Sequence, residues 1–218
     1  MYYIKFSDFF IVGSSPETLV KVEKNKVTIK PIAGTRLKEK GKEEEIKEDL
    51  LSDPKELAEH LMLLDLGRND VGRVSKVGSI NVKESFQIQE TSHLYHIYST
   101  VEGDLNPEED RVSALCAGFP AGTVTGAPKI RAMEIINEIE DRKRGIYSGA
   151  IGYFSSSGDM DTAIALRTAV IKDNKMYVQA GGGVVYDSDE EYEFNETLNK
   201  AQALFSAAKE VLTKQEIK

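Results

Sequence analysis

A chain of 218 residues can hold one sizeable hydrophobic core and at most two domains. Its formal net charge of −8 argues against a nucleic-acid partner, and no segment approaches the roughly 20 apolar residues of a membrane span. The single cysteine, Cys116, excludes a disulfide framework and a thiolate metal cluster. Because no apolar run of signal-peptide length occurs at the N-terminus, we expect a reducing, cytoplasmic setting.

The N-terminal region predicts short strands joined by tight turns. Residues 3–6 and 9–12 are rich in apolar and aromatic side chains, which favour strands, and residues 19–29 predict a hairpin. Residues 36–50 are rich in Lys and Glu, which favours a solvated loop and an exposed helix face.

A helix is expected to begin at Asp53-Pro54, because Asp is a favourable cap and Pro suits the first helical turn. Gly67 and Gly72 are expected to mark its end. Its predicted apolar face consists of Leu57, Ala58, Leu61, Met62, Leu64 and Leu66.

The rest of the chain mixes strands and helices. Strands are predicted near residues 80–82, 86–88, 94–101, 149–154, 161–171 and 175–180. Helices are predicted around residues 110–117, after Pro128 and over about 189–212. This order lacks regular alternation of strand and helix, so it predicts an α+β fold with largely antiparallel sheets. No long linker or repeat interrupts it, and residues 1–218 are expected to form a single domain.

Glycine-rich stretches could bring backbone close to a ligand. Gly34 and Thr35 follow a predicted strand, where they form either an ordinary turn or a ligand contact. Gly181, Gly182 and Gly183 follow another strand and indicate either a wall of backbone N–H groups or a bulge. Residues 122–129 precede a helix whose N-terminus would attract an anion, although a tight packing turn also fits.

Carboxylates occur at positions that suit a hard metal ion. Glu59 lies on an otherwise apolar helix stripe, and Glu193, Glu196 and Lys200 share one face of the last predicted helix. Two carboxylates one turn apart repel unless a cation intervenes, and oxygen ligands suit Mg²⁺. A solvent-exposed helix with ordinary salt bridges is the alternative.

Taken together, several stretches resemble the chorismate-utilising enzymes, a family that includes anthranilate, aminodeoxychorismate, isochorismate and salicylate synthases. They are residues 31–36, 58–70, 122–133, 160–168 and 196–201. The chain is most similar to the anthranilate synthases. Ala33 stands where aminodeoxychorismate synthases usually carry a nucleophilic Lys, and Thr123 also fits the anthranilate branch better.

The resemblance implies roles for thirteen residues. It makes Glu59 and Glu196 ligands of Mg²⁺, with Glu193 beside the ion through water. It assigns chorismate binding to Gly34, Thr35, Tyr147, Arg167, Gly181, Gly182, Gly183 and Lys200. His96 would assist departure of the ring hydroxyl, and Thr123 would line the same pocket.

The resemblance also implies a reaction and partners. Ammonia, released from glutamine by a separate glutaminase subunit, would add to the chorismate ring as the C4 hydroxyl leaves, and loss of pyruvate would yield anthranilate. Family members are about twice this long, so we expect an N-terminally incomplete domain. Two origins stay open: a natural truncation, whose missing half would be a separate chain, or a fragment of a longer protein. Two alternatives stay open: an aminodeoxychorismate synthase component, or an inactive remnant of the family.

Overall fold

A computed structural model describes residues 1–91, 94–186 and 188–216 of the chain, which divides into two compact units. Unit 1 comprises Met1–Pro16, Arg142–Gly149 and Ile164–Lys218, and unit 2 comprises Glu17–Asp141 and Ala150–Ala163. Each unit is therefore assembled from segments far apart in the sequence. The expected single domain over residues 1–218 stays a prediction.

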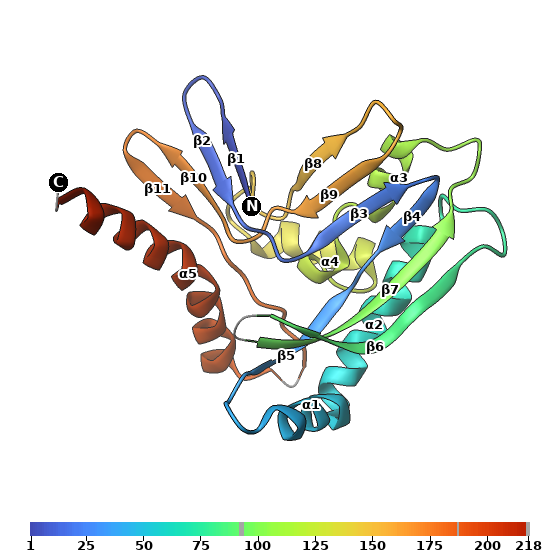
Figure 1. The fold of residues 1–218 in the computed structure, drawn as a ribbon, viewed down its shortest axis with the longest axis horizontal. Coiled ribbons are helices and arrows are strands. Elements are labelled where there is room, and N and C mark those ends of the chain that lie inside the picture. Colours follow the sequence, from blue (N-terminus) through green and yellow to red (C-terminus); the bar gives the residue numbers. More distant parts are fainter. Residues whose placement is uncertain (92–93, 187, 217–218) are drawn as a thin grey trace. The chain divides into compact units, whose positions relative to one another are not determined.

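Unit 1 contains a four-stranded antiparallel sheet among its described residues (Figure 1). Its order is β1 (Tyr2–Lys5), β2 (Phe10–Gly13), β10 (Thr168–Lys172) and β11 (Lys175–Val178). Val12 lies opposite Ala169, and the Tyr2 and Thr168 hydroxyl oxygens are 2.6 Å apart. Strand β2 thus pairs on one side with the N-terminal strand β1 and on the other with β10, from the last third of the chain. The acidic first turn predicted for the last helix is confirmed in α5 (Glu190–Glu216).

Unit 2 contains a seven-stranded sheet within the described part of the chain, and its strand pairs are antiparallel. The strands are β3 (Thr18–Glu23), β4 (Lys26–Ile29), β5 (Ile32–Leu37), β6 (Asn81–Glu90), β7 (Leu94–Asp104), β8 (Ala150–Phe154) and β9 (Met160–Ile164). The long strand β7 pairs with β6 on one edge, while β4 and β5 share the other. The predicted α+β class with largely antiparallel sheets is confirmed.

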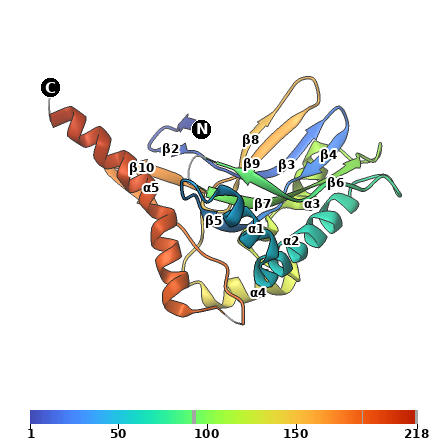
Figure 2. The ribbon, with the colours of Figure 1, turned by 60° about the horizontal axis from the view of Figure 1, so that its bottom comes forward.

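The helices of unit 2 are α1 (Glu43–Ser52), α2 (Pro54–Gly72), α3 (Arg111–Gly118), the 3₁₀ turn η1 (Gly122–Val124) and α4 (Lys129–Ile139). Figures 1 and 2 show α2 running along one face of the seven-stranded sheet. The predicted start of α2 is confirmed: Asp53 Oδ1 accepts hydrogen bonds from the backbone N–H groups of Lys55 (2.9 Å) and Glu56 (3.4 Å). No described helix is both long and apolar enough to cross a membrane.

Helix α2 buries only part of the predicted face: Leu64 is buried, Leu57, Met62 and Leu66 are half-buried, and Ala58 is exposed. Leu61 is 49% exposed, whereas His60, Leu63 and Leu64 are buried. Gly67 does not end the helix: a Cβ atom there would lie 3.6 Å from the Ile29 side chain. That distance is an ordinary van der Waals contact, so Gly67 faces the sheet, and packing against the sheet selects the buried face.

Other local predictions are wrong because pairing with distant strands, which local sequence patterns do not report, determines these elements. The expected turn at Gly34 is instead part of strand β5, and the two strands predicted near 80–82 and 86–88 form one strand, β6, which begins at Asn81. The predicted strand over 161–171 is broken near Arg167, whose φ of +47° is left-handed. Leu50, in the stretch expected to be solvated, is fully buried with Tyr95 and Ile97.

Candidate active site

The thirteen predicted site residues divide between the two units. Unit 1 holds Tyr147, Arg167, Gly181, Gly182, Gly183, Glu193, Glu196 and Lys200. Unit 2 holds Gly34, Thr35, Glu59, His96 and Thr123. Each unit therefore carries its own part of the predicted site.

In unit 1, the glycine segment lies against one face of α5. A Cβ atom at Gly182 would lie 3.2 Å from Glu196 Oε2 and 3.4 Å from Glu193 Oε2. Lys200 forms an ion pair with Glu196 at 3.1 Å, and its Nζ is 3.4 Å from the carbonyl oxygen of Gly181. These three charged side chains are half-buried, so the face is not the wholly solvent-exposed one of the alternative interpretation.

Tyr147 joins this group from the segment before β8. A Cβ atom at Gly181 would lie only 2.9 Å from the Tyr147 hydroxyl oxygen, and the Arg144 guanidinium lies 5.6 Å from the centre of the Tyr147 ring. A Cβ at Gly183 would meet nothing within 4 Å. Close approach therefore explains the first two glycines of the run, and the open space at the third leaves room for a ligand.

Arg167 lies between β9 and β10. Its carbonyl oxygen accepts a hydrogen bond from Ser14 N–H at 3.2 Å, and nearby the Ser148 N–H donates to the Ala165 carbonyl at 3.2 Å. The Arg167 side chain is half-buried, and among the described residues it has no hydrogen-bond or ion-pair partner. Because a partly desolvated charge is costly without a counter-ion, this guanidinium suits an anionic ligand.

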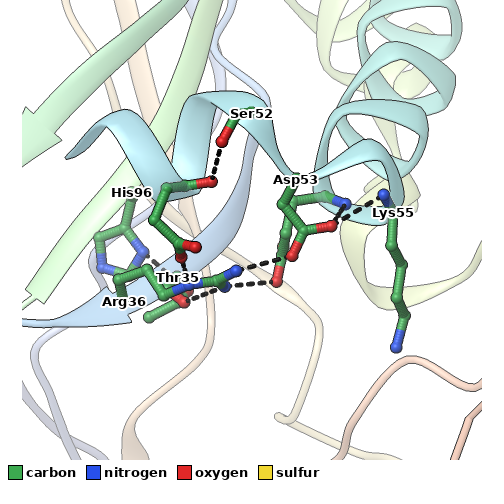
Figure 3. Close-up of polar contacts among 8 residues, drawn as sticks. Thr35, Arg36, Ser52, Asp53, Lys55 and His96 are labelled. Carbon is green, nitrogen blue, oxygen red and sulfur yellow. Dashed lines mark hydrogen bonds and ion pairs between the residues drawn. The ribbon is translucent and has the colours of Figure 1, made fainter. Parts of the chain in front are cut away.

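In unit 2, Thr35 on β5 contacts His96 on β7, as Figure 3 shows. The Thr35 Oγ1 and His96 Nδ1 atoms are 3.0 Å apart, and the two residues are directly opposite in the strand register. The register shifts at Gly34, whose φ is +79°. A Cβ there would also lie 3.1 Å from Glu56 Oε2 and from Ile97 Cδ1. Conformation and space therefore both favour glycine at this position.

Thr123 lies in η1, between α3 and α4. Its hydroxyl oxygen is buried and has no hydrogen-bond partner among the described residues. A side chain at Gly122 would collide with Leu66 of α2 and approach Leu63, so the loop packs on that helix. Glu59 lies one turn before Leu63 on the same helix. Because a buried hydroxyl without a partner costs free energy, Thr123 is suited to bind a ligand.

His60 has a structural role, although it is adjacent to Glu59. Its Nε2 lies 2.7 Å from Ser99 Oγ, and that oxygen also accepts the Phe86 N–H at 3.0 Å. Burial lowers the pKa of His60 to about 4, so the ring is neutral at pH 7. This side chain holds α2 against the sheet.

Sequence reasoning missed a buried ion pair between two of the motifs that carry the resemblance. Lys129 Nζ lies 2.8 Å from Asp70 Oδ2, and the two side chains are 11% and 8% exposed. Burial raises the pKa of Asp70, against the lowering effect of the Lys129 hydrogen bond and charge. No local pattern pairs residues 59 positions apart. It also missed Arg36, which is bound by three carboxylates rather than solvated.

The predicted metal ligands have the chemistry that Mg²⁺ prefers. Glu193 and Glu196 direct carboxylate oxygens to the same glycine, and Lys200 offsets only part of their charge. Glu59 belongs to the other unit, and no group of three or more His, Cys, Asp or Glu among the described residues could hold a metal ion. The two unit 1 carboxylates thus fit a partial coordination shell, and the complete site stays a prediction.

The fold recurs in two solved structures. Anthranilate synthase component I from Streptococcus pneumoniae matches with a TM-score of 0.87 and 50% identity, over 93% of this chain and 45% of that chain. The menaquinone-specific isochorismate synthase from Escherichia coli matches with a TM-score of 0.82 and 26% identity, over 91% of this chain and 46% of that chain. The fold is therefore that of a class of enzyme domains that includes anthranilate and isochorismate synthases.

The sequence comparisons agree with the fold. The chain belongs to the chorismate-binding enzyme family, whose sequence model matches residues 1–206. It is 58% identical over 212 residues to anthranilate synthase component 1 from Cereibacter sphaeroides, which is 96% of this chain and 42% of the relative. The resemblance inferred from the motifs is confirmed, and the chain spans less than half the length of this relative.

Proposed function

We propose that the chain supplies the chorismate-binding part of an anthranilate synthase component I. The observation that carries this proposal is the arrangement in unit 1, where two carboxylates and Lys200 lie against the glycine segment beside Tyr147. Relatives between 54% and 58% identical to the chain bear the name anthranilate synthase component 1. Ala33 has no nucleophile, which also disfavours the covalent route of aminodeoxychorismate synthases.

Chorismate carries two carboxylates, and residues of unit 1 can bind both. Arg167 and Tyr147 would hold the enolpyruvyl carboxylate, since a guanidinium can grip it with two parallel hydrogen bonds. Lys200 would lie next to the ring carboxylate. Gly181, Gly182 and Gly183 would offer backbone contacts along the substrate.

Mg²⁺ would be held by Glu59 and Glu196, with Glu193 beside it through water. When bound, the ion would supply Lewis-acid stabilisation of negative charge. These carboxylates would orient the ring carboxylate through it, and Lys200 would limit their mutual repulsion.

Residues of unit 2 would act on the ring. His96 would assist departure of the C4 hydroxyl as ammonia adds, with Thr123 lining the pocket and Gly34 and Thr35 bordering the ring. Loss of pyruvate then gives anthranilate. Ammonia would come from a glutaminase subunit, and the cytoplasmic setting stays a prediction.

Full activity is expected to need the part of the relatives' length that this chain does not span, supplied in the test as a second polypeptide. In the described residues, β1 and β11 are the outer strands of the four-stranded sheet, and such strands carry unpaired backbone groups. The isolated chain should therefore self-associate or order only partly, and should form little anthranilate. Adding the N-terminal half should restore ammonia-dependent activity, and adding the glutaminase should let glutamine replace ammonia.

The test is a fluorescence assay for anthranilate with chorismate, Mg²⁺ and ammonia, combined with size-exclusion measurements of mass. It is run on the chain alone and after each addition. Chromatographic identification of an aminated product that keeps the enolpyruvyl group would favour the aminodeoxychorismate alternative. Failure to bind chorismate with Mg²⁺, even in the assembled complex, would favour the inactive remnant. A monomeric chain with full activity by itself would contradict the need for a second polypeptide.

A further inference from the structure

The bulge in β5 decides which residue faces His96. Residues Ile32 and Ala33 lie opposite Tyr98 and Ile97, so an unbroken ladder would place Gly34 opposite His96. Instead Gly34 is the extra residue, and Thr35 takes the place opposite His96. A bulge re-aims the side chains that follow it, and here it brings a hydroxyl to within 3.0 Å of the imidazole Nδ1.

Arg36 holds the bulge in place. Its Nε, Nη2 and Nη1 atoms donate to Asp49 (2.8 Å), Asp53 (2.7 Å) and Glu56 (2.9 Å). Nη1 also donates to the backbone carbonyl of Thr35 at 3.1 Å. Figure 3 shows Arg36, Thr35 and Asp53 in this network. The guanidinium therefore ties the peptide unit after Thr35 to the ends of α1 and α2.

The hydrogen bonds of this cluster keep Arg36 and Asp53 in their charged forms. Burial lowers the pKa of Arg36, but the hydrogen bonds to the three carboxylates outweigh it and raise that pKa overall. Burial raises the pKa of Asp53, but Arg36 and the N–H groups at the start of α2 lower it further than burial raises it. Both groups are thus charged across the pH range of an assay. The hydrogen bond from Arg36 to the Thr35 carbonyl therefore does not change with pH in that range.

We propose that Thr35 is a positioning residue that fixes the tautomer of His96. Two arrangements fit the 3.0 Å distance: Thr35 O–H donating to Nδ1, or Nδ1–H donating to Thr35. Neutral imidazole intrinsically favours its proton on Nε2, and an unprotonated imidazole nitrogen is a stronger acceptor than a hydroxyl oxygen. Both factors favour donation by Thr35, which leaves Nε2–H as the hydrogen-bond donor of His96.

This inference rests on the proposed function for its catalytic meaning. In that setting Nε2–H is the group that can donate to the departing ring hydroxyl of chorismate. Thr35 then acts through His96, in addition to bordering the ring. The tautomer itself does not depend on any activity, so it can be measured in the absence of substrate.

The experiment is ¹⁵N NMR of the assembled complex, with only this chain labelled at histidine, recorded without substrate at a pH where the rings are neutral. The sequence has only three histidines, and His96→Gln and His60→Gln variants assign the signals. We expect His96 to show one protonated nitrogen, Nε2, and one accepting nitrogen, Nδ1, with widely separated shifts. In Thr35→Val this separation should shrink as the tautomers mix, and Thr35→Ser should restore it. The His60 signals are the internal control and should not change.

Two results would overturn the inference. One is a wild-type His96 protonated on Nδ1, and the other is an unchanged pair of shifts in Thr35→Val. In the assembled enzyme, Thr35→Val should lower kcat about tenfold, and Thr35→Ser should recover it. An assembled complex without activity would reject the proposed function but leave the NMR result standing.

Discussion

Replacing Lys129 by methionine would leave the Asp70 carboxylate buried without its counter-ion. The two charged atoms are 2.8 Å apart and the side chains are 11% and 8% exposed. Removing one partner of such a pair typically costs about 3–5 kcal/mol, because the remaining charge sits in a low dielectric without compensation. Methionine keeps much of the aliphatic stem, so the lost packing is small. We therefore expect Lys129→Met to lower the free energy of unfolding by about 3 kcal/mol at pH 7.5.

The pH dependence of this loss has a definite sign. Burial already raises the pKa of Asp70 in the folded chain, and removing Lys129 removes the larger contributions that lower it, leaving only that of the Arg73 charge. A raised folded-state pKa means that the contribution of the group to stability is present at low pH and lost as the pH rises through that pKa. The deficit of Lys129→Met should thus be smaller at pH 5 than at pH 7.5, by at most about 1.4 kcal/mol for each pH unit over which Asp70 titrates.

The assay is urea denaturation followed by circular dichroism at both pH values. The matched control is Arg131→Met on the same helix, because Arg131 is 55% exposed and forms only surface ion pairs with Glu134 and Glu138. It should cost less than about 1 kcal/mol. The double variant Asp70→Asn with Lys129→Met should be more stable than Lys129→Met alone, since no unpaired charge remains. Equal deficits at both pH values, without recovery in the double variant, would refute the reasoning.

Three further predictions concern unit 1. In the assembled enzyme, Glu196→Gln should lower turnover by orders of magnitude while the chain folds as well or better, because carboxylate repulsion is relieved; unchanged dependence on Mg²⁺ would reject the metal role. Arg167→Lys keeps the charge but loses the planar fork, so calorimetry should show weaker chorismate binding, and equal affinities would reject the anchoring role. Gly181→Ala would crowd the Tyr147 hydroxyl and should cost about 1–3 kcal/mol in thermal unfolding, whereas Gly183→Ala should cost almost nothing; equal shifts would contradict the packing.

Local sequence signals determined much of the fold. Asp53 and Pro54 start α2 because a cap and a fixed φ act within one turn of chain. The spacing of Glu193, Glu196 and Lys200 placed them on one face of α5 because helical periodicity is a local property. The irregular order of strands and helices indicated antiparallel sheets, and the motifs identified the family. These predictions needed only interactions between residues near one another in the sequence.

The features that position the candidate site residues depended on tertiary structure. The bulge at Gly34 exists because β5 pairs with β7, and this register puts Thr35 beside His96. Leu61 is exposed and His60 buried because the packing of α2 on the sheet, where Gly67 faces Ile29, decides which side of the helix is covered.

The buried pair of Lys129 with Asp70, the carboxylates around Arg36 and the left-handed φ of Arg167 likewise leave no periodic signal in the sequence. Propensity and spacing report which backbone shapes a segment favours. They do not report which distant segment supplies its counter-ions and strand partners, and only the folded chain decides that.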